Sequence, residues 1–488
     1  MSKILWKCSD KKLKNSNLFK FEDFLKKKYR IKHKNNYEQL WNWSVRNSGE
    51  FWKSIWEFSN VKGQLGSKLN YFSNIFYKNE FLPDSKLNFA ENLLTKNDNT
   101  IAATFISENG YKENKTWKDL KKDIFKISNW LKSIGIKKND RIAAYLPNCV
   151  ETVEAFLSSA AIGAIWSSCS PDFGTKGVIE RFSQIDPKVL FIGDKYYYNG
   201  KEIDILGRTQ DILKNIPSIK YLVIIAYPAT KTSNYKLNLK NIKILEWKDI
   251  IAGNEGIMDF ELFDFNHPLT ILYSSGTTGK PKCICHRSGG VLLQHIKEHT
   301  LHCDIKPNDK VFYFTTCGWM MWNWLISSLA SKASILLFDG FPMYKKDDLL
   351  FEITNIEEIT LFGISAKYID TLKKNKIIPM NKFNLSNLKT ICSTGSPLSQ
   401  DGFNYVYQNI KKDVHLASIS GGTDIVSCFV LGNLYQPVIS GEIQNKGLGM
   451  DVDIFDEKGN SIKNKKGELV CKKPFPSMPI KFWNDEGD

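Results

Sequence analysis

The chain of 488 residues is poor in arginine. Only six of its 67 basic residues are arginines, and the others are lysines spread along the whole sequence. The six are Arg30, Arg46, Arg141, Arg181, Arg208 and Arg287. Proteins that read nucleic acids usually concentrate arginine and aromatic residues on one face. The composition therefore argues against a nucleic-acid partner, and the net charge of +15 predicts a lysine-rich surface that attracts polyanionic ligands.

Long hydrophobic runs are also absent. No segment has the length of a membrane span, and no apolar stretch near Met1 has the form of a signal peptide. We therefore expect a cytoplasmic protein that does not insert into a membrane. The ten cysteines show no paired C-x-x-C spacing, which favours reduced, buried thiols over a disulfide or zinc framework. These features leave the oligomeric state open.

The middle of the chain alternates between short apolar runs and helical patterns. Thr116 begins a sequence that resembles a capping box, and apolar residues then recur at helical spacing as far as Ile134. Val150 to Ala161 also has the pattern of a helix. Strands are expected at 141–146, 164–166, 188–192, 221–225, 269–273, 310–314, 333–338 and 388–392. This order predicts an α/β fold with largely parallel sheets.

The two ends of the chain differ from its middle. Residues 1–95 carry large apolar side chains at helical spacing, for example between Tyr37 and Trp56, and predict a helical cap. Residues 96–445 form the predicted core, which consists of two parallel-sheet α/β subdomains. Residues 446–488 contain short strands joined by turns, and they predict the start of a small β-barrel-like subdomain.

The most informative motif directly follows the apolar strand 269–273. It consists of Ser274, Ser275, Gly276, Thr277, Thr278, Gly279, Lys280, Pro281 and Lys282. Glycines let backbone amides surround an anion, hydroxyls donate hydrogen bonds, and lysines add positive charge. The spacing excludes a Walker A loop, which needs four residues between its glycines. A glycine-rich surface turn is the alternative, but the composition favours a loop that binds a polyphosphate.

Two further loops follow predicted strands downstream of this motif. Gly395, Ser396 and Pro397 come after the strand 388–392, and an apolar run before Ser420 leads into Gly421, Gly422, Thr423 and Asp424. In α/β folds, ligands bind at the C-terminal edges of parallel strands. The glycines permit close approach of a ligand to the backbone, and the Asp424 carboxylate could hold a hard cation against phosphate oxygens. Taken alone, the first of these loops would be an ordinary turn.

These motifs resemble the signatures of the acyl-adenylate-forming enzymes, a family that includes acyl-CoA synthetases and luciferases. The resemblance implies that residues 274–280 bind the phosphates of ATP, that 395–397 hold the adenine, and that 421–423 contact the nucleotide. The implied catalytic residues are Thr277, Lys282, Thr423 and Asp424, and the implied Mg²⁺ ligands are Asp424 and Thr277.

Within that family, the sequence is similar to one subgroup, the acetoacetyl-CoA synthetases. Most members of the family have Thr-Glu where this chain has Thr423-Asp424, and the change is typical of the subgroup. The segment Thr315–Trp324, with its Gly-Trp-Met-Met-Trp-Asn-Trp sequence, indicates the same subgroup. The resemblance implies ATP-dependent activation of acetoacetate to acetoacetyl-adenylate. CoA would then displace AMP to give acetoacetyl-CoA.

The resemblance also assigns residues to the acyl and CoA sites. Trp319, Met320, Met321 and Gly421 are expected to line the acyl pocket. Acetyl-CoA synthetases place a tryptophan at the position of Gly421, so we expect the glycine to leave space for a longer acid. The CoA site is expected near Gly163 and Lys201.

Three histidines require a separate interpretation. The spacing of His295, His299 and His302 would place three imidazoles on one helical face, which makes a zinc site conceivable. The sequence offers neither a fourth ligand nor the order H-E-x-x-H, and the same histidines occur in the subgroup pattern. We therefore expect no zinc.

The family pattern extends beyond Asp488. Members normally continue into a ribose-binding aspartate, a hinge and a mobile C-terminal domain that carries a lysine used in adenylation. The motifs align so that this sequence ends before those features, and we expect a fragment of a longer gene product. Two alternatives stay open. One is a CoA ligase for acetate, propionate or butyrate, and the other is an ATP-binding protein with impaired catalysis.

Overall fold

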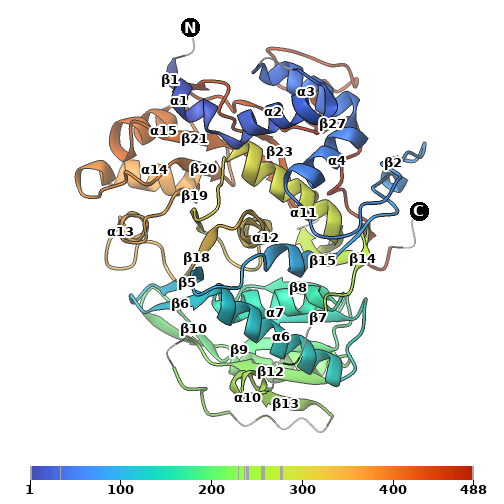
Figure 1. Ribbon diagram of the computed structural model, residues 1–488. Helices are drawn as coiled ribbons and strands as arrows, with labels where there is room; N and C mark the ends of the chain where they lie inside the picture. Colours follow the sequence, from blue (N-terminus) through green and yellow to red (C-terminus); the bar gives the residue numbers. More distant parts are fainter. Residues whose placement is uncertain are drawn as a thin grey trace.

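The computed structural model describes residues 3–32, 35–228, 230–235, 237, 241–253, 256, 259–274 and 279–485. Two large mixed sheets dominate the fold, one of eight strands and one of seven. In Figure 1 the N-terminal helices lie at the top of the molecule, and the first sheet lies at the bottom. The predicted α/β class is confirmed.

The first sheet has the strand order β13-β12-β9-β7-β8-β15-β16-β28. The bounds are β7 Arg141–Tyr145, β8 Ile165–Cys169, β9 Val189–Gly193, β12 Tyr221–Ile225, β13 Lys243–Glu246, β15 Pro268–Ser274, β16 Lys282–Arg287 and β28 Lys481–Phe482. The strands from β13 to β15 are parallel, and β16 and β28 are added antiparallel. The inner strands β7, β8, β9 and β12 are almost continuously buried, as expected for a sheet that is covered on both faces.

The second sheet has the strand order β21-β20-β19-β17-β18-β5-β6. The bounds are β5 Ile101–Ser107, β6 Lys112–Thr116, β17 Lys310–Tyr313, β18 Ser334–Asp339, β19 Leu361–Ser365, β20 Thr390–Thr394 and β21 His415–Ser418. β5 pairs in parallel with β18, and the antiparallel strand β6 forms the edge. A hairpin that precedes the first sheet in the sequence thus completes the second sheet.

The helices surround and separate these sheets. Their bounds are α1 Asp10–Lys14, α2 Asn17–Tyr29, α3 Tyr37–Arg46, α4 Ser48–Phe58, α5 Phe89–Leu93, α6 Trp117–Ser133, α7 Val150–Ala161, α8 Thr175–Phe182, α9 Leu206–Asn215, α10 Trp247–Ile251, α11 Ser288–Lys297, α12 Met320–Ser327, α13 Leu349–Ile356, α14 Ala366–Lys374 and α15 Gln400–Tyr405. The predicted cap at Thr116 is confirmed, because its hydroxyl accepts a hydrogen bond from Asp119 N at 3.0 Å.

Short strands complete the fold. They are β1 Ile4–Trp6 with β24 Val438–Ile439, β2 Asn70–Tyr71 with β3 Glu80–Phe81, β4 Lys86–Leu87 with β14 Phe263–Asp264, β10 Lys195–Tyr198 with β11 Lys201–Asp204, the group β22 Ser420–Gly422, β23 Ser427–Leu431 and β25 Asn445–Lys446, and β26 Val452–Phe455 with β27 Glu468–Cys471. After residue 446, β26 and β27 pair as a small antiparallel sheet. The β-barrel-like subdomain expected to start here stays a prediction.

The N-terminal helices pack onto the C-terminal part of the chain. Tyr37 Oη donates to Lys446 O at 2.6 Å, and Trp41 Nε1 donates to Met450 O at 3.0 Å. The ten cysteines are free thiols, and all except Cys471 are buried. Along the described part of the chain, none of the helices combines the length and apolar character needed to cross a membrane.

Gly363, in the middle of β19, makes a stability prediction possible. It pairs with Tyr313 of β17, and a Cβ atom added to it would lie 2.1 Å from Cδ2 of the Tyr313 ring. The ring is buried, so it has little room to move. We expect Gly363→Ala to lower the free energy of unfolding by about 1–3 kcal/mol, measured by urea unfolding. Gly174→Ala is the control, because an added Cβ meets nothing within 4 Å there; equal stability of the two variants would contradict the prediction.

Candidate active site

A cavity of about 870 Å³ opens at the C-terminal edge of the second sheet. Tyr313, Ser365, Thr394 and Ser418, the last residues of β17, β19, β20 and β21, all line it. The start of α12 and the hairpin of β22 and β23 form further walls. The cavity therefore occupies the position at which parallel α/β sheets bind ligands.

The first predicted loop lies in this cavity. Gly395, Ser396 and Pro397 line it directly after β20. Gly395 has a φ of +89°, a left-handed conformation that favours glycine. Thr394 Oγ1 donates to Ile419 O at 3.2 Å, which ties this turn to the next strand end.

The second predicted loop forms the neighbouring wall. Gly421, Gly422 and Thr423 line the cavity, because β22 turns back into β23 at this point. Asp424 lies in that turn with an exposed side chain and does not line the cavity.

The expectation that Gly421 leaves empty space for a longer acyl chain is wrong. A Cβ atom on Gly421 would lie 1.9 Å from Ser427 O and 2.6 Å from Cys428 Cα. The backbone of β23 fills the space toward which a side chain would point. The glycine is required for the close pairing of β22 with β23, and its backbone lines the cavity.

The predicted acyl-pocket side chains from α12 also reach the cavity. Trp319, Met320 and Met321 all line it. Trp319 is 59% exposed, whereas Met321 is buried. Trp322 and Trp324 point instead into the core, where both are buried. Trp319 therefore lies at the rim of the cavity, whereas Trp322 and Trp324 belong to the core.

The structure describes only the two ends of the phosphate-loop motif. Ser274 ends β15 and pairs with Lys282 of β16, so the motif connects two antiparallel strands. Ser275, Gly276, Thr277 and Thr278 lie outside the described residues. The Lys282 side chain is exposed, and its Nζ lies 5.5 Å from the centre of the Phe482 ring. Neither Lys282 nor Lys280 lines the cavity.

The two predicted CoA residues lie away from the cavity. Gly163 is buried between α7 and β8, and its carbonyl accepts a hydrogen bond from Asn139 N at 2.9 Å. Lys201 is exposed at the start of β11. The preceding residue, Gly200, donates its N–H to a carboxylate oxygen of Glu108 at 2.7 Å.

Sequence reasoning missed several cavity residues. Ser427 and Cys428 of β23 line it together with Glu442. The only local signal was the position of β23 after two glycines and a turn.

Glu298, which lies outside the cavity lining, was also missed, although it lies one residue before His299. A glutamate in a helical pattern normally predicts a solvated face.

Two of the three histidines form hydrogen bonds with neighbouring groups, and His299 packs against an aromatic ring. His295 Nδ1 lies 2.8 Å from Ser327 Oγ, and His302 Nδ1 lies 2.8 Å from Gly432 O. The His299 ring packs edge-on against Trp324 with a centroid separation of 4.2 Å. Among the residues that the structure describes, no group of three or more histidine, cysteine and acidic side chains is arranged to hold a metal ion.

The class of protein follows from the fold, the cavity and a family comparison. The model of the family described as "AMP-binding enzyme" matches residues 90–478, which include the second sheet, every strand of the first sheet except β28, and the loops around the cavity. The chain therefore belongs to the AMP-binding enzyme family.

Individual relatives narrow this placement to the acetoacetyl-CoA synthetases. The acetoacetyl-coenzyme A synthetase of Rhizobium meliloti (strain 1021) is 46% identical over 451 residues, covering 92% of this chain and 69% of the relative. The acetoacetyl-CoA synthetase of Gallus gallus is 42% identical, covering 92% and 68%. The solved structure of the acetoacetyl-CoA synthetase from Streptomyces lividans superimposes with a TM-score of 0.92 at 34% identity, covering 99% of this chain and 74% of that one. The resemblance inferred from the motifs is confirmed.

Proposed function

We propose that this chain activates acetoacetate with ATP and transfers the acyl group to CoA. The main support for this proposal is that one cavity is lined both by the turn Gly395–Pro397 and by the side chains of Met320 and Met321. An adenine site and an acyl site that share a cavity suit a reaction in which the two groups become joined as an acyl-adenylate. The names of the relatives support acetoacetate as the acid.

The reaction has two halves. A carboxylate oxygen of the acid attacks the α-phosphorus of ATP, the acyl-adenylate forms, and pyrophosphate leaves with the electron pair of the broken P–O bond. The CoA thiol then attacks the acyl carbonyl, gives its proton to solvent, and displaces AMP. Such chemistry requires mainly positioning and stabilisation of negative charge.

Each predicted residue has a role in this proposal. Gly395, Ser396 and Pro397 hold the adenine, and the Thr423 hydroxyl contacts the α-phosphate. The segment from Ser274 to Lys282 neutralises the departing pyrophosphate. By the resemblance, CoA binds near Gly163 and Lys201, outside this cavity.

The residues near the α-phosphate also suit a magnesium ion. Asp424 presents an exposed carboxylate next to Thr423, and carboxylate and hydroxyl oxygens are the ligands that Mg²⁺ prefers. Asp424 and Thr277 would hold the ion, which when bound neutralises charge on the phosphate oxygens.

The proposal is tested by acid-dependent exchange of labelled pyrophosphate into ATP. We expect exchange with acetoacetate to exceed that with acetate or butyrate by about tenfold or more, because a polar group that finds its partner in the site is strongly selected. The assay is run with residues 1–488. Faster exchange with acetate or butyrate would contradict the substrate, and ATP binding without exchange for any acid would support a non-catalytic role.

Malonamate is a second acid for the same assay. A malonamoyl-CoA synthetase of Penicillium aethiopicum is 35% identical over 494 residues, covering 96% of this chain and 68% of the relative. Malonamate and acetoacetate share a carbonyl group two carbons from the carboxylate. Exchange that prefers malonamate would replace acetoacetate in the proposal and leave the reaction unchanged.

A further inference from the structure

A buried carboxylate lies directly behind the cavity. Glu298 begins the π-helical segment Glu298–His302, which continues α11 through the middle of the molecule (Figure 1). Its side chain is completely inaccessible to solvent, with an exposed fraction of 0%. π-helical turns inside α-helices frequently occur at functional sites. The sequence-based functional interpretation gave Glu298 no role.

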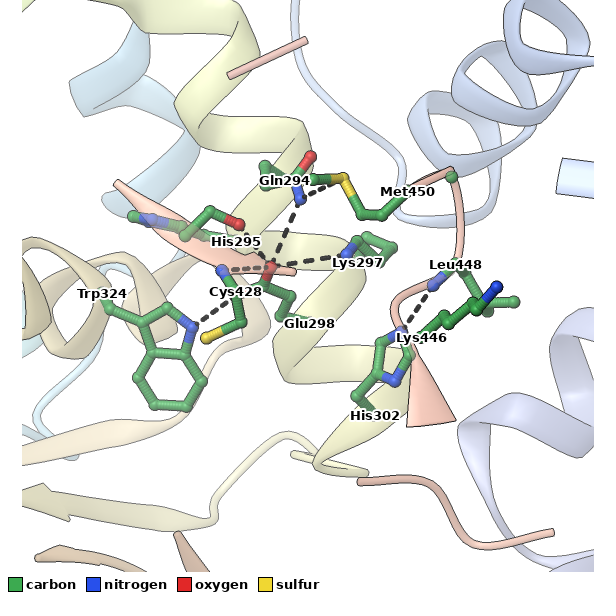
Figure 2. Close-up of polar contacts among 12 residues, drawn as sticks. Gln294, His295, Lys297, Glu298, His302, Trp324, Cys428, Lys446, Leu448 and Met450 are labelled. Carbon is green, nitrogen blue, oxygen red and sulfur yellow. Dashed lines mark hydrogen bonds and ion pairs between the residues drawn. The ribbon is translucent and has the colours of Figure 1, made fainter. Parts of the chain in front are cut away.

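Both carboxylate oxygens of Glu298 are occupied by hydrogen-bond donors (Figure 2). Oε2 accepts from Trp324 Nε1 at 2.9 Å. Oε1 accepts from the Ser427 hydroxyl, from Cys428 N at 3.3 Å and from Gln294 Nε2 at 3.3 Å. Trp324 Nε1, Cys428 N and Gln294 Nε2 can only donate, so each needs an acceptor oxygen from Glu298. The arrangement therefore requires both side-chain oxygens of Glu298 to accept hydrogen bonds.

Glu298 also pairs with an adjacent lysine. Lys297 Nζ lies 3.4 Å from Glu298 Oε1, and its side chain is also fully buried. Burial lowers the Lys297 pKa. Buried ion pairs are often less stabilising than well-packed apolar residues of similar volume. We therefore assign the role of Glu298 to its hydrogen bonds with other elements and not to its pairing with Lys297.

The elements that Glu298 connects are two walls of the cavity. Trp324 belongs to α12, whose first turn places Met320 and Met321 in the cavity. Ser427 and Cys428 belong to β23 and line the cavity from the β22–β23 hairpin. A single carboxylate thus links the acyl-pocket helix with the hairpin that carries Thr423.

We propose that Glu298 is a positioning residue that sets the separation between α12 and the β22–β23 hairpin, and thereby the fit of the acid. This inference rests on the proposed function, because it assigns the acid to the space between these walls. Glu298 does not contact the substrate in this arrangement. It acts through Trp324 on one side and through Ser427 and Cys428 on the other.

The test is Glu298→Gln in the pyrophosphate-exchange assay. The amide keeps the shape of the side chain but replaces one acceptor by a donor, which faces a donor of Trp324 or Ser427. We expect the half-saturating concentration of acetoacetate to rise by about tenfold or more, with less than about a threefold change for ATP. Trp324→Phe, which removes the Nε1–H donor together with part of a buried ring, should shift the same quantity in the same direction by a smaller factor.

The control is a variant that lowers stability far from the cavity. Leu222→Ala removes a buried side chain from β12 of the first sheet, and it should lower the melting temperature without changing either half-saturating concentration. If Glu298→Gln and Trp324→Phe lowered only the melting temperature or the maximal rate, Glu298 would be merely structural and the inference would be overturned. If Glu298→Gln fails to fold, Trp324→Phe alone decides. An absence of acid-dependent exchange in the unsubstituted protein would contradict the proposed function instead.

Discussion

Below pH 6.5 the protein is expected to lose stability steeply. Burial lowers the pKa of every histidine that the structure describes, to about 3 for His286 and to about 4 for His415. The full set is His267, His286, His295, His299, His302 and His415. In the unfolded chain these imidazoles bind protons below about pH 6.5, whereas in the fold they stay neutral. Unfolding therefore takes up protons, and the free energy of unfolding falls as the pH falls.

Buried carboxyl groups partly offset this loss. Burial raises the pKa of Glu154 to about 8 and that of Asp339 to about 7. These carboxyl groups bind protons at a higher pH in the folded protein than in the unfolded chain. Their contribution to the free energy of unfolding therefore grows as the pH falls. Burial also raises the pKa of Glu22, Glu151 and Asp304. Because six histidines oppose five carboxyl groups, unfolding still takes up protons near pH 5.5, and the free energy of unfolding falls as the pH falls.

The measurement is urea unfolding at pH 7.5, 6.5 and 5.5. His299→Phe is the matched variant, because a benzene ring can keep the edge-on packing against Trp324 but cannot bind a proton. It should reduce the pH slope by about 1.4 kcal/mol per pH unit. A free energy of unfolding that is equal at pH 7.5 and 5.5 would contradict the prediction. An unchanged slope in the variant would assign the proton uptake to other groups.

Gly421→Ala should abolish most of the acid-dependent exchange. Its methyl group would lie 1.9 Å from Ser427 O, and backbone cannot yield as a side-chain tip can. β22 and β23 would have to separate, which would displace Thr423 and the cavity wall. A displacement of about 1 Å in a positioned group can reduce a rate about 100-fold, and we expect a loss of that size. The same clash should lower the free energy of unfolding by about 1–3 kcal/mol.

Gly422→Ala provides the stability control for this prediction. The nearest atom to an added Cβ there is Asp424 Oδ2 at 3.9 Å, so this variant should unfold at the same urea concentration as the unsubstituted protein. Gly421→Ala and Gly422→Ala together separate a steric clash from a general sensitivity of the loop. Wild-type exchange and stability in Gly421→Ala would show that the hairpin can open at no cost and that its pairing does not require a glycine at position 421.

The sequence by itself determined the local elements and the loops at their ends. The helix from Val150 to Ala161 and the strand from Tyr221 to Ile225 have the predicted bounds, because apolar periodicity and caps act over a few residues. The turn at Gly395 and the loop at Thr423 were found for the same reason. Their glycines and hydroxyls directly follow apolar strands, and the ends of parallel strands meet at one edge.

The tertiary structure alone decided how these elements meet. The pairing of β5 with β18 joins residues more than two hundred positions apart, and no local pattern specifies such a partner. The direction of a Cβ on Gly421 depends on the register between β22 and β23, so the sequence predicted space where backbone lies. Glu298 shows the same limit, because its partners come from α12 and β23 and only their packing converts a helical glutamate into a buried link between two walls of the cavity.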